Sequence, residues 1–167
     1  MAGAATANDS NFVIPDPGNP VNRFYEVDAG VYRGARPDGA ALTYLASTLK
    51  VRTVLDLEND NGAISAERPM AEVQGMRFVS IPLSGFLPPS DADIHAALSL
   101  LGDRANYPVF VHCHYGEDRT GLVIGLYRVF NDHWTPADAY REMKNDGFHS
   151  MLVPLYLYFK HATGYDD

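Results

Sequence analysis

The stretch HCHYGEDRTG, residues 112–121, decides how this chain folds and where its site lies. It follows PVFV, an apolar and β-branched run typical of a buried parallel strand, and it leads into an apolar segment, 120–130, with the pattern of a buried helix. Five residues separate Cys113 from Arg119. A loop of that length can curl so that successive backbone N–H groups face inward, and the positive end of the next helix reinforces this anion nest. The sequence therefore predicts a phosphate-binding loop between a strand and a helix.

The side chains of this loop have the chemistry that phosphoryl transfer needs. The positive field of the nest favours the ionised form of Cys113, a strong nucleophile toward phosphorus. Arg119 offers a planar fork of donors to two phosphate oxygens, which lysine does not reproduce. The Thr120 hydroxyl can stabilise the departing thiolate, Gly116 permits the backbone twist, and His112 is expected to orient the loop from behind. The remaining loop positions are expected to face the substrate or to support the loop: His114, Tyr115, Glu117 and Gly121.

Outward from the loop, apolar strand-like runs alternate with amphipathic helix-like segments. A hairpin is expected over 24–33, buried strands over 51–57 and 76–83, and helices over 40–49, 63–74, 91–101, 136–145 and 153–161. This alternation predicts an α/β fold with a mainly parallel central sheet flanked by helices, and ligands in such folds bind at the carboxyl ends of strands. We expect an extended Pro-rich arm over 1–23 and one domain over 24–167.

Composition and charge narrow the classes of partner. The chain has 13 Lys and Arg against 21 Asp and Glu, a net charge of -8, which argues against nucleic acid and anionic membrane surfaces as partners. An anionic small molecule can still bind in a local pocket of arginines and backbone amides. With one cysteine there is no internal disulfide and no cysteine-rich metal site, so neither a metal nor a cofactor is expected. A monomer is expected.

The beginning of the chain, Met1 to Asn11, lacks the basic and apolar regions of an intact signal peptide. It is compatible with the remainder of a removed signal or with a truncated start. We expect a periplasmic or secreted protein, with the cytoplasm as the alternative. No apolar run in the sequence approaches the length of a membrane span.

The loop resembles the signature of the protein tyrosine phosphatase superfamily, HC-x-x-G-x-x-R-T/S-G, and it matches every fixed position. YRGARP at 32–37 and VRTVLDL at 51–57 also resemble segments of atypical dual-specificity and inositol phosphatases, so the resemblance covers roughly 24–160. It implies a dual-specificity phosphatase fold and a metal-independent phosphomonoesterase. Under this resemblance Arg33 and Arg36 would flank the pocket and meet additional phosphates of the substrate. The alternative is that both are solvent-facing strand and turn residues.

The source of the catalytic proton differs from most of the superfamily. An aspartate is usual on an upstream loop, but Ser84 and Gly85 stand there in this sequence. Asp118 precedes Arg119, and this DRT arrangement resembles myotubularin-like and bacterial lipid phosphatases, which implies that Asp118 is the general acid. Its alternative role is to brace the loop. Asp91 is the alternative acid, as is the nearby Asp93, although residues beside the Ser90 helix cap are commonly capping groups.

The resemblance to protein-tyrosine-phosphatase-like phytases implies an inositol polyphosphate substrate, myo-inositol hexakisphosphate in particular. The acidic residues Glu117 and Asp118 depart from the more basic loops of that group. The alternatives are a phosphotyrosine, dual-specificity or phosphoinositide phosphatase and, more remotely, a phosphate-binding pseudophosphatase without activity.

Overall fold

The structure is a computed structural model, and it describes residues 16–167. Within them, a five-stranded sheet has the strand order β1-β2-β5-β3-β4. The strands are β1 Tyr25–Asp28, β2 Val31–Ala35, β3 Thr53–Asp56, β4 Arg77–Ser80 and β5 Val109–Cys113. The helices are α1 Gly39–Ser47, α2 Asn61–Val73, α3 Asp91–Gly102, α4 Arg119–Phe130, α5 Pro136–Asn145 and α6 Val153–Thr163, with a short 3-10 turn at Arg104–Asn106.

The topology confirms the predicted fold class. β1 and β2 form the expected antiparallel hairpin, and every other pairing in the sheet is parallel. β5 lies in the middle of the sheet between β2 and β3. The loop that follows Cys113 therefore leaves from the carboxyl end of the central strand, where ligands of such sheets bind.

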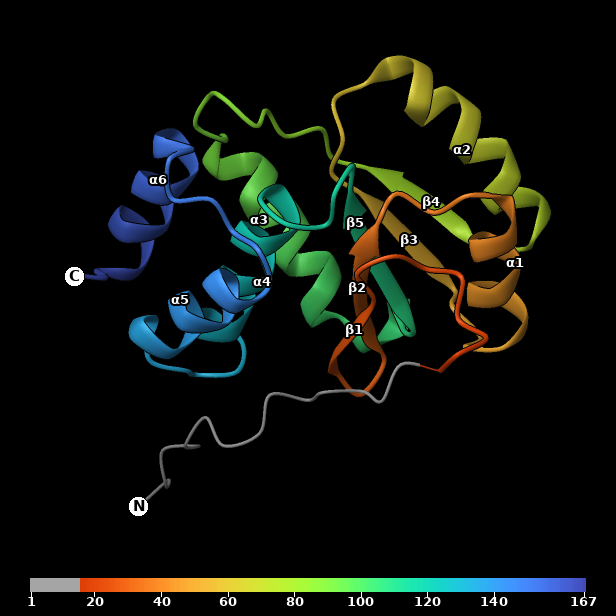
Figure 1. Cartoon of the computed structure of the whole chain (residues 1–167), viewed down its shortest axis with the longest axis horizontal. Helices are drawn as coiled ribbons and strands as arrows, with labels where there is room; N and C mark the ends of the chain where they lie inside the picture. The colour runs from red at the N-terminus through yellow and green to blue at the C-terminus, as the bar shows by residue number, and fades with distance from the viewer. Residues whose placement is uncertain (1–15) are drawn as a thin grey trace.

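Helices cover both faces of the sheet, as Figure 1 shows, with α1 and α2 on one side and α3 to α6 on the other. Alternate residues of a strand point to opposite faces, and β5 divides its side chains accordingly. Val109, Val111 and Cys113 enter the core beneath α3 to α6, while Phe110 belongs to the core beneath α1 and α2. The same alternation sends Cys113 and its neighbour His112 to opposite sides of the sheet.

Local signals account for several helix boundaries. Ser90 caps α3 by accepting from the N–H of Asp93, and Thr135 caps α5 in the same way ahead of Pro136. The strands β3 and β4 are shorter than the apolar runs that predicted them. Leu57 and Leu83 lie beyond the ends of these strands but are still buried in the core. The apolar runs therefore mark buried residues more widely than they mark strand residues.

Of the expected arm over 1–23, residues 1–15 lie outside the described part of the chain. Residues 16–23 form turns without a helix or strand, and they run beside the sheet edge, where the N–H of Ala35 donates to the Asn22 carbonyl at 2.9 Å. Val21 is buried against the α1–α2 core. Among residues 16–167, no helix is long and apolar enough to cross a membrane.

Candidate active site

The loop from Cys113 to Arg119 turns sharply at Gly116. Cys113 is buried at the end of β5, and Arg119 is the first residue of α4. Gly116 has a φ of +71°, a conformation that glycine adopts without a steric penalty. A Cβ atom there would lie 2.5 Å from the backbone carbonyl group of Gly34. The loop is therefore packed directly onto β2, and the glycine predicted for the backbone twist is required for that contact.

Arg33 lies beneath the loop, and the prediction that it flanks the pocket is wrong. Its side chain is 1% exposed, because this position of β2 faces the core beneath α4 to α6. One guanidinium nitrogen donates to the Gly116 carbonyl at 2.9 Å and another to Asp146 Oδ2 at 3.0 Å. The alternative expectation, a solvent-facing strand residue, is wrong for the same reason. Arg33 supports the turn of the loop from inside.

Arg36 lies beside the mouth of the pocket, but Glu58 engages its guanidinium. Nε donates to Glu58 Oε1 at 2.8 Å and Nη2 donates to Oε2, so the pair is bidentate. This hydrogen bonding raises the pKa of Arg36. A paired guanidinium offers less to a second phosphate than a free one, because the substrate has to compete with a buried carboxylate.

The side chain of Arg119 spans the carboxyl ends of the neighbouring strands. It donates to Asn59 Oδ1 at 3.0 Å and to the Leu83 carbonyl at 3.3 Å, in the connections that follow β3 and β4. The next residue, Thr120, is buried, and its hydroxyl has no hydrogen-bond partner. Buried hydroxyls without a partner are uncommon. The Thr120 hydroxyl is therefore a donor that a group in the pocket could use.

A pocket of about 260 Å³ opens over the loop. Cys113, Arg119 and Asp118 line it, together with a group of polar and apolar residues: Asn59, Gly85, Phe86, His114, Tyr115 and Leu152. The structure thus brings five residues of the loop motif to one pocket: Cys113, His114, Tyr115, Asp118 and Arg119. Asn59, Phe86 and Leu152 were not predicted, since they lie in three separate connections.

Asp118 lines this pocket, whereas Asp91 and Asp93 do not. Asp118 Oδ1 accepts from the His149 N–H at 2.7 Å, and the His149 ring Nδ1 lies 3.1 Å from the same oxygen. Asp91 instead accepts from the Tyr158 hydroxyl at 2.7 Å, and Asp93 belongs to the cap of α3. Of the three candidate acids, only Asp118 faces the pocket.

Glu117 does not line this pocket. It forms an ion pair of 2.5 Å with Arg23, and one of its oxygens lies 3.6 Å from His149 Nδ1. This contact ties the loop to the segment that precedes β1. Glu117, predicted among the substrate-binding residues, thus acts in this structure as a brace between two segments.

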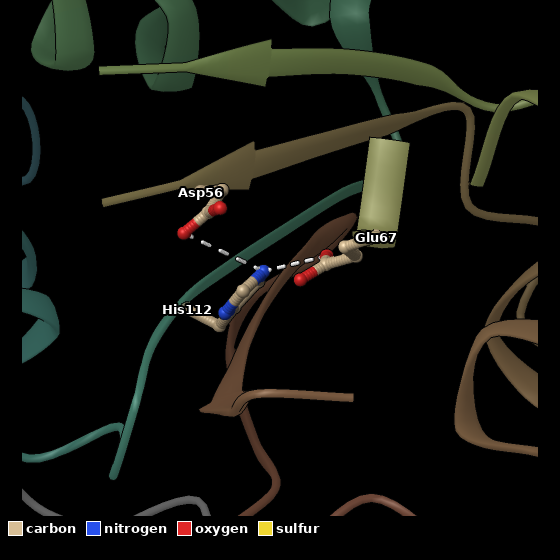
Figure 2. A group of neighbouring side chains, drawn as sticks. All are labelled: Asp56, Glu67 and His112. Carbon is tan, nitrogen blue, oxygen red and sulfur yellow. Dashed lines mark hydrogen bonds and ion pairs between the residues drawn. The ribbon is translucent and has the colours of Figure 1, made fainter. Parts of the chain in front are cut away.

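Behind the loop, on the other face of the sheet, His112 contacts two buried carboxylates that sequence reasoning missed (Figure 2). His112 Nε2 lies 2.8 Å from Glu67 Oε1 of α2 and 3.9 Å from Asp56 Oδ1 of β3. The available signal was the carboxylate at position 67, three residues after Ile64 and four before Ala71. That spacing puts Glu67 on the apolar face of α2.

A cysteine at the end of a central parallel strand, a glycine-containing loop over a pocket and an arginine at the next helix N-terminus are the features of a cysteine-dependent phosphate-handling protein. The sequence matches the model described as Tyrosine phosphatase family over residues 19–146. The chain belongs to this family.

Curated proteins similar to this chain include a dual specificity protein phosphatase and an inositol diphosphatase. The chain is 30% identical over 132 residues to the dual specificity protein phosphatase TpbA of Pseudomonas aeruginosa (strain UCBPP-PA14), covering 78% of this chain and 57% of that protein. It is 35% identical over 113 residues to the inositol diphosphatase DSP1 of Oryza sativa subsp. japonica, covering 65% of this chain and 50% of that protein. The chain thus spans about half the length of these relatives.

Solved structures of both kinds share the fold. The core catalytic domain of the PP-IP phosphatase SIW14 from S. cerevisiae, in complex with citrate, has a TM-score of 0.73 at 22% identity, covering 86% of this chain and 89% of that one. P. aeruginosa TpbA has a TM-score of 0.71 at 26% identity, covering 87% and 86%. These likenesses confirm the phosphatase-like α/β fold.

Gly116→Ala is expected to lower the affinity for inorganic phosphate about tenfold or more, because the new Cβ forces the loop off β2 and misaligns its N–H groups. Isothermal titration calorimetry measures this affinity. Gly75→Ala is the matched control, since Gly75 also has a positive φ of +82° but open space around its Cβ position. Equal losses in the two variants would contradict the role of loop packing.

Proposed function

We propose that the protein is a cysteine-dependent phosphoric monoester hydrolase. The observation that carries the proposal is that Cys113 and Arg119 line one pocket, at the junction of the central strand with α4. A pseudophosphatase is disfavoured, since both residues and the buried hydroxyl of Thr120 are in place. Family membership over residues 19–146 supports the same reaction class.

The reaction would proceed in two displacements on phosphorus. In the first, the Cys113 thiolate attacks, the bond from phosphorus to the ester oxygen breaks, and Asp118 gives its proton to the leaving alkoxide or phenoxide. In the second, water attacks the phosphorus of the phosphocysteine and the Asp118 carboxylate takes a proton from that water. The phosphorus–sulfur bond breaks, which releases inorganic phosphate and restores the Cys113 thiolate. Arg119 and the loop N–H groups stabilise the charge on the phosphoryl oxygens in both steps.

The nucleophile is tested with Cys113→Ser, without added metal, on three substrates side by side: inositol hexakisphosphate, a phosphotyrosine peptide and a phosphoinositide. Phosphate release is expected to fall at least about a thousandfold on every substrate that the wild type hydrolyses, because a serine hydroxyl is far less ionised than a thiol. Retained phosphate binding shows that the loop has kept its shape. Substantial turnover by the serine variant would rule the proposal out.

An inositol phosphate is the substrate class that the relatives' names support. DSP1 of Oryza sativa and DSP4 of Arabidopsis thaliana are both named inositol diphosphatases. For inositol hexakisphosphate in particular, fewer arginine side chains are available to bind phosphate groups than the sequence indicated. Arg33 is buried, and Arg36 and Arg23 each have a carboxylate partner. A highly phosphorylated ring therefore finds few uncommitted cations around Arg119.

A phosphate ester with an aromatic or apolar leaving group is the second candidate, because exposed apolar side chains surround the pocket. Phe86 is 79% exposed, Tyr115 64% and Met151 80%, and they come from three separate loops. Phe86 and Tyr115 line the phosphate pocket itself, and Tyr115 and Met151 line the adjoining hollow with Leu152. Clustered exposed apolar residues commonly mark a binding surface. A structure of TpbA in complex with pTyr has the same fold.

Phe86→Ser separates the two substrate classes. If the apolar rim binds the leaving group, KM for a phosphotyrosine peptide is expected to rise about fivefold to tenfold, the equivalent of one lost aromatic contact. KM for an inositol phosphate stays unchanged. Val73→Ser is the control, since Val73 is 82% exposed on α2 and lines none of the hollows beside the loop. An unchanged KM for the peptide in Phe86→Ser would favour the inositol phosphate.

Asp118→Asn tests the general acid. For an alkyl or tyrosyl phosphate, kcat is expected to fall about a hundredfold or more, because the leaving oxygen has to depart without its proton. For 4-nitrophenyl phosphate, whose leaving group needs little protonation, the loss should be less than about tenfold. Asp91→Asn on the same two substrates is the matched control. The larger, leaving-group-dependent loss in Asp91→Asn would reverse the assignment.

A further inference from the structure

A buried charge cluster lies directly behind the phosphate loop. His112 and Asp56 are 0% exposed, Glu67 is 2% exposed and Glu58 1%. Three elements contribute to it, since Asp56 belongs to β3, Glu67 to α2 and His112 to β5 (Figure 2). His112 precedes the nucleophile in the sequence but faces away from it, toward α2. Ionisable groups are almost never buried to this degree without a partner that compensates them.

The hydrogen-bond partners of the imidazole favour a ring that is protonated on both nitrogens. Nε2 faces a carboxylate oxygen of Glu67 at 2.8 Å, and Nδ1 faces the Cys113 backbone carbonyl at 3.3 Å. A carbonyl oxygen only accepts hydrogen bonds, as does an ionised carboxylate, so both ring nitrogens need a proton to bond both neighbours. Burial is the largest influence and by itself lowers the pKa of His112. The hydrogen bond and the charge of Glu67, the charge of Asp56 and the Cys113 carbonyl together outweigh it, so the pKa of His112 is raised.

The other groups facing the ring are consistent with a positive imidazolium. Asp56 pairs in register with His112 across the sheet and accepts from the Glu58 N–H at 2.8 Å. Burial raises the pKa of Asp56 to about 6, although nearby His112 lowers it. Glu58 Oε1 lies 3.8 Å from Nδ1, and Arg36 engages the same carboxylate. Glu67 is thus the carboxylate that touches the ring.

A metal ion is the competing occupant, since Asp56, Glu67 and His112 offer ligand atoms that all lie within 4.8 Å of one another. A metal would need the Nε2 lone pair free. In the structure that nitrogen is already hydrogen-bonded to Glu67 at 2.8 Å, and none of the hollows described around the phosphate loop and the sheet edge is lined by Asp56, Glu67 or His112. A shared proton accounts for the contact without an ion.

We propose that Glu67 is a positioning residue for the phosphate loop: it holds His112 in its doubly protonated form. One N–H of the ring then anchors the backbone carbonyl of Cys113, and the charged ring belongs to the residue directly before the nucleophile. The inference rests on the proposed function only in taking Cys113 as the reactive thiol. On this proposal a residue from α2, on the far face of the sheet, contributes to the reactivity of the Cys113 thiol.

Glu67→Gln removes the charge but retains a hydrogen-bonding partner. A neutral ring can keep Nδ1–H on the Cys113 carbonyl while the glutamine amide donates to Nε2, so the loop holds its shape. Alkylation of Cys113 by iodoacetamide at pH 6 is therefore expected to slow about tenfold and to recover at pH 9, while the affinity for inorganic phosphate changes less than twofold. Glu72→Gln is the matched control, because Glu72 lies on the same helix with an exposed side chain. It should leave both quantities unchanged.

Nitrogen-15 NMR of the wild type is a test that needs no variant. Two protonated ring nitrogens on His112 at pH 7, reduced to one in Glu67→Gln, are the expected result. A neutral His112 in the wild type, an unchanged alkylation rate in Glu67→Gln, or stoichiometric metal in the purified protein would each overturn the proposal. Alkylation requires no substrate, so the outcome does not depend on which ester is hydrolysed. Slow alkylation that does not recover at pH 9 would show a merely structural role and would also overturn it.

Discussion

The site depends on the side-chain alternation of the central strand β5. Adjacent residues of a strand face opposite sides of a sheet, so His112 and Cys113 cannot share a layer. Cys113, the last residue of β5, faces the side of the sheet on which α4 packs. His112, the residue before it, faces the side on which α2 packs. A shift of β5 by one residue against its parallel neighbours would exchange the two. In the register with β2, Cys113 pairs with Ala35, and in the register with β3, His112 pairs with Asp56. These two registers therefore determine which side chain lies on each face of the sheet.

The positive charges near the loop are distributed between support and recognition. Arg33 bonds the Gly116 carbonyl from below, and Arg36 is locked to Glu58 beside the mouth. Arg119 instead contacts neutral acceptors, the Asn59 side chain and the Leu83 carbonyl, and within residues 16–167 it forms no ion pair with a carboxylate that would compete with a phosphate. Breaking the bidentate Arg36–Glu58 pair would leave a buried carboxylate without its partner, which is costly, so Arg36 is held away from a substrate phosphate. This distribution suits one phosphate group held tightly better than several held at once.

Local patterns predicted the strand, loop and helix around Cys113, and the caps at Ser90 and Thr135, because these features are set by neighbours in sequence. The places of Arg33 and Glu67 were not predictable in the same way. Arg33 meets Asp146, 113 positions away, and Glu67 meets His112, 45 positions away. A charged residue in a strand or helix usually indicates a solvated position. Only tertiary packing shows that these two face inward, although the apolar neighbours of Glu67 on its helix face, Ile64 and Ala71, were a signal.

The loop after β4 explains why the proton donor has to come from elsewhere. Ser84 Oγ accepts from the N–H groups of Phe86 and Leu87 at 3.0 and 3.1 Å, which folds this segment into a tight turn. The turn leaves Phe86 and Leu87 exposed, and Phe86 lies on the pocket rim directly after Ser84 and Gly85, the positions at which an upstream aspartate was expected. An apolar rim at that position favours contact with a leaving group but supplies no proton. Under the proposed function, the proton has to come from the phosphate loop itself, where Asp118, held by the backbone N–H of His149, lines the pocket. The proposal therefore divides contact with the leaving group and proton donation between two loops, because the turn at Ser84 offers an apolar side chain and the phosphate loop offers a carboxylate.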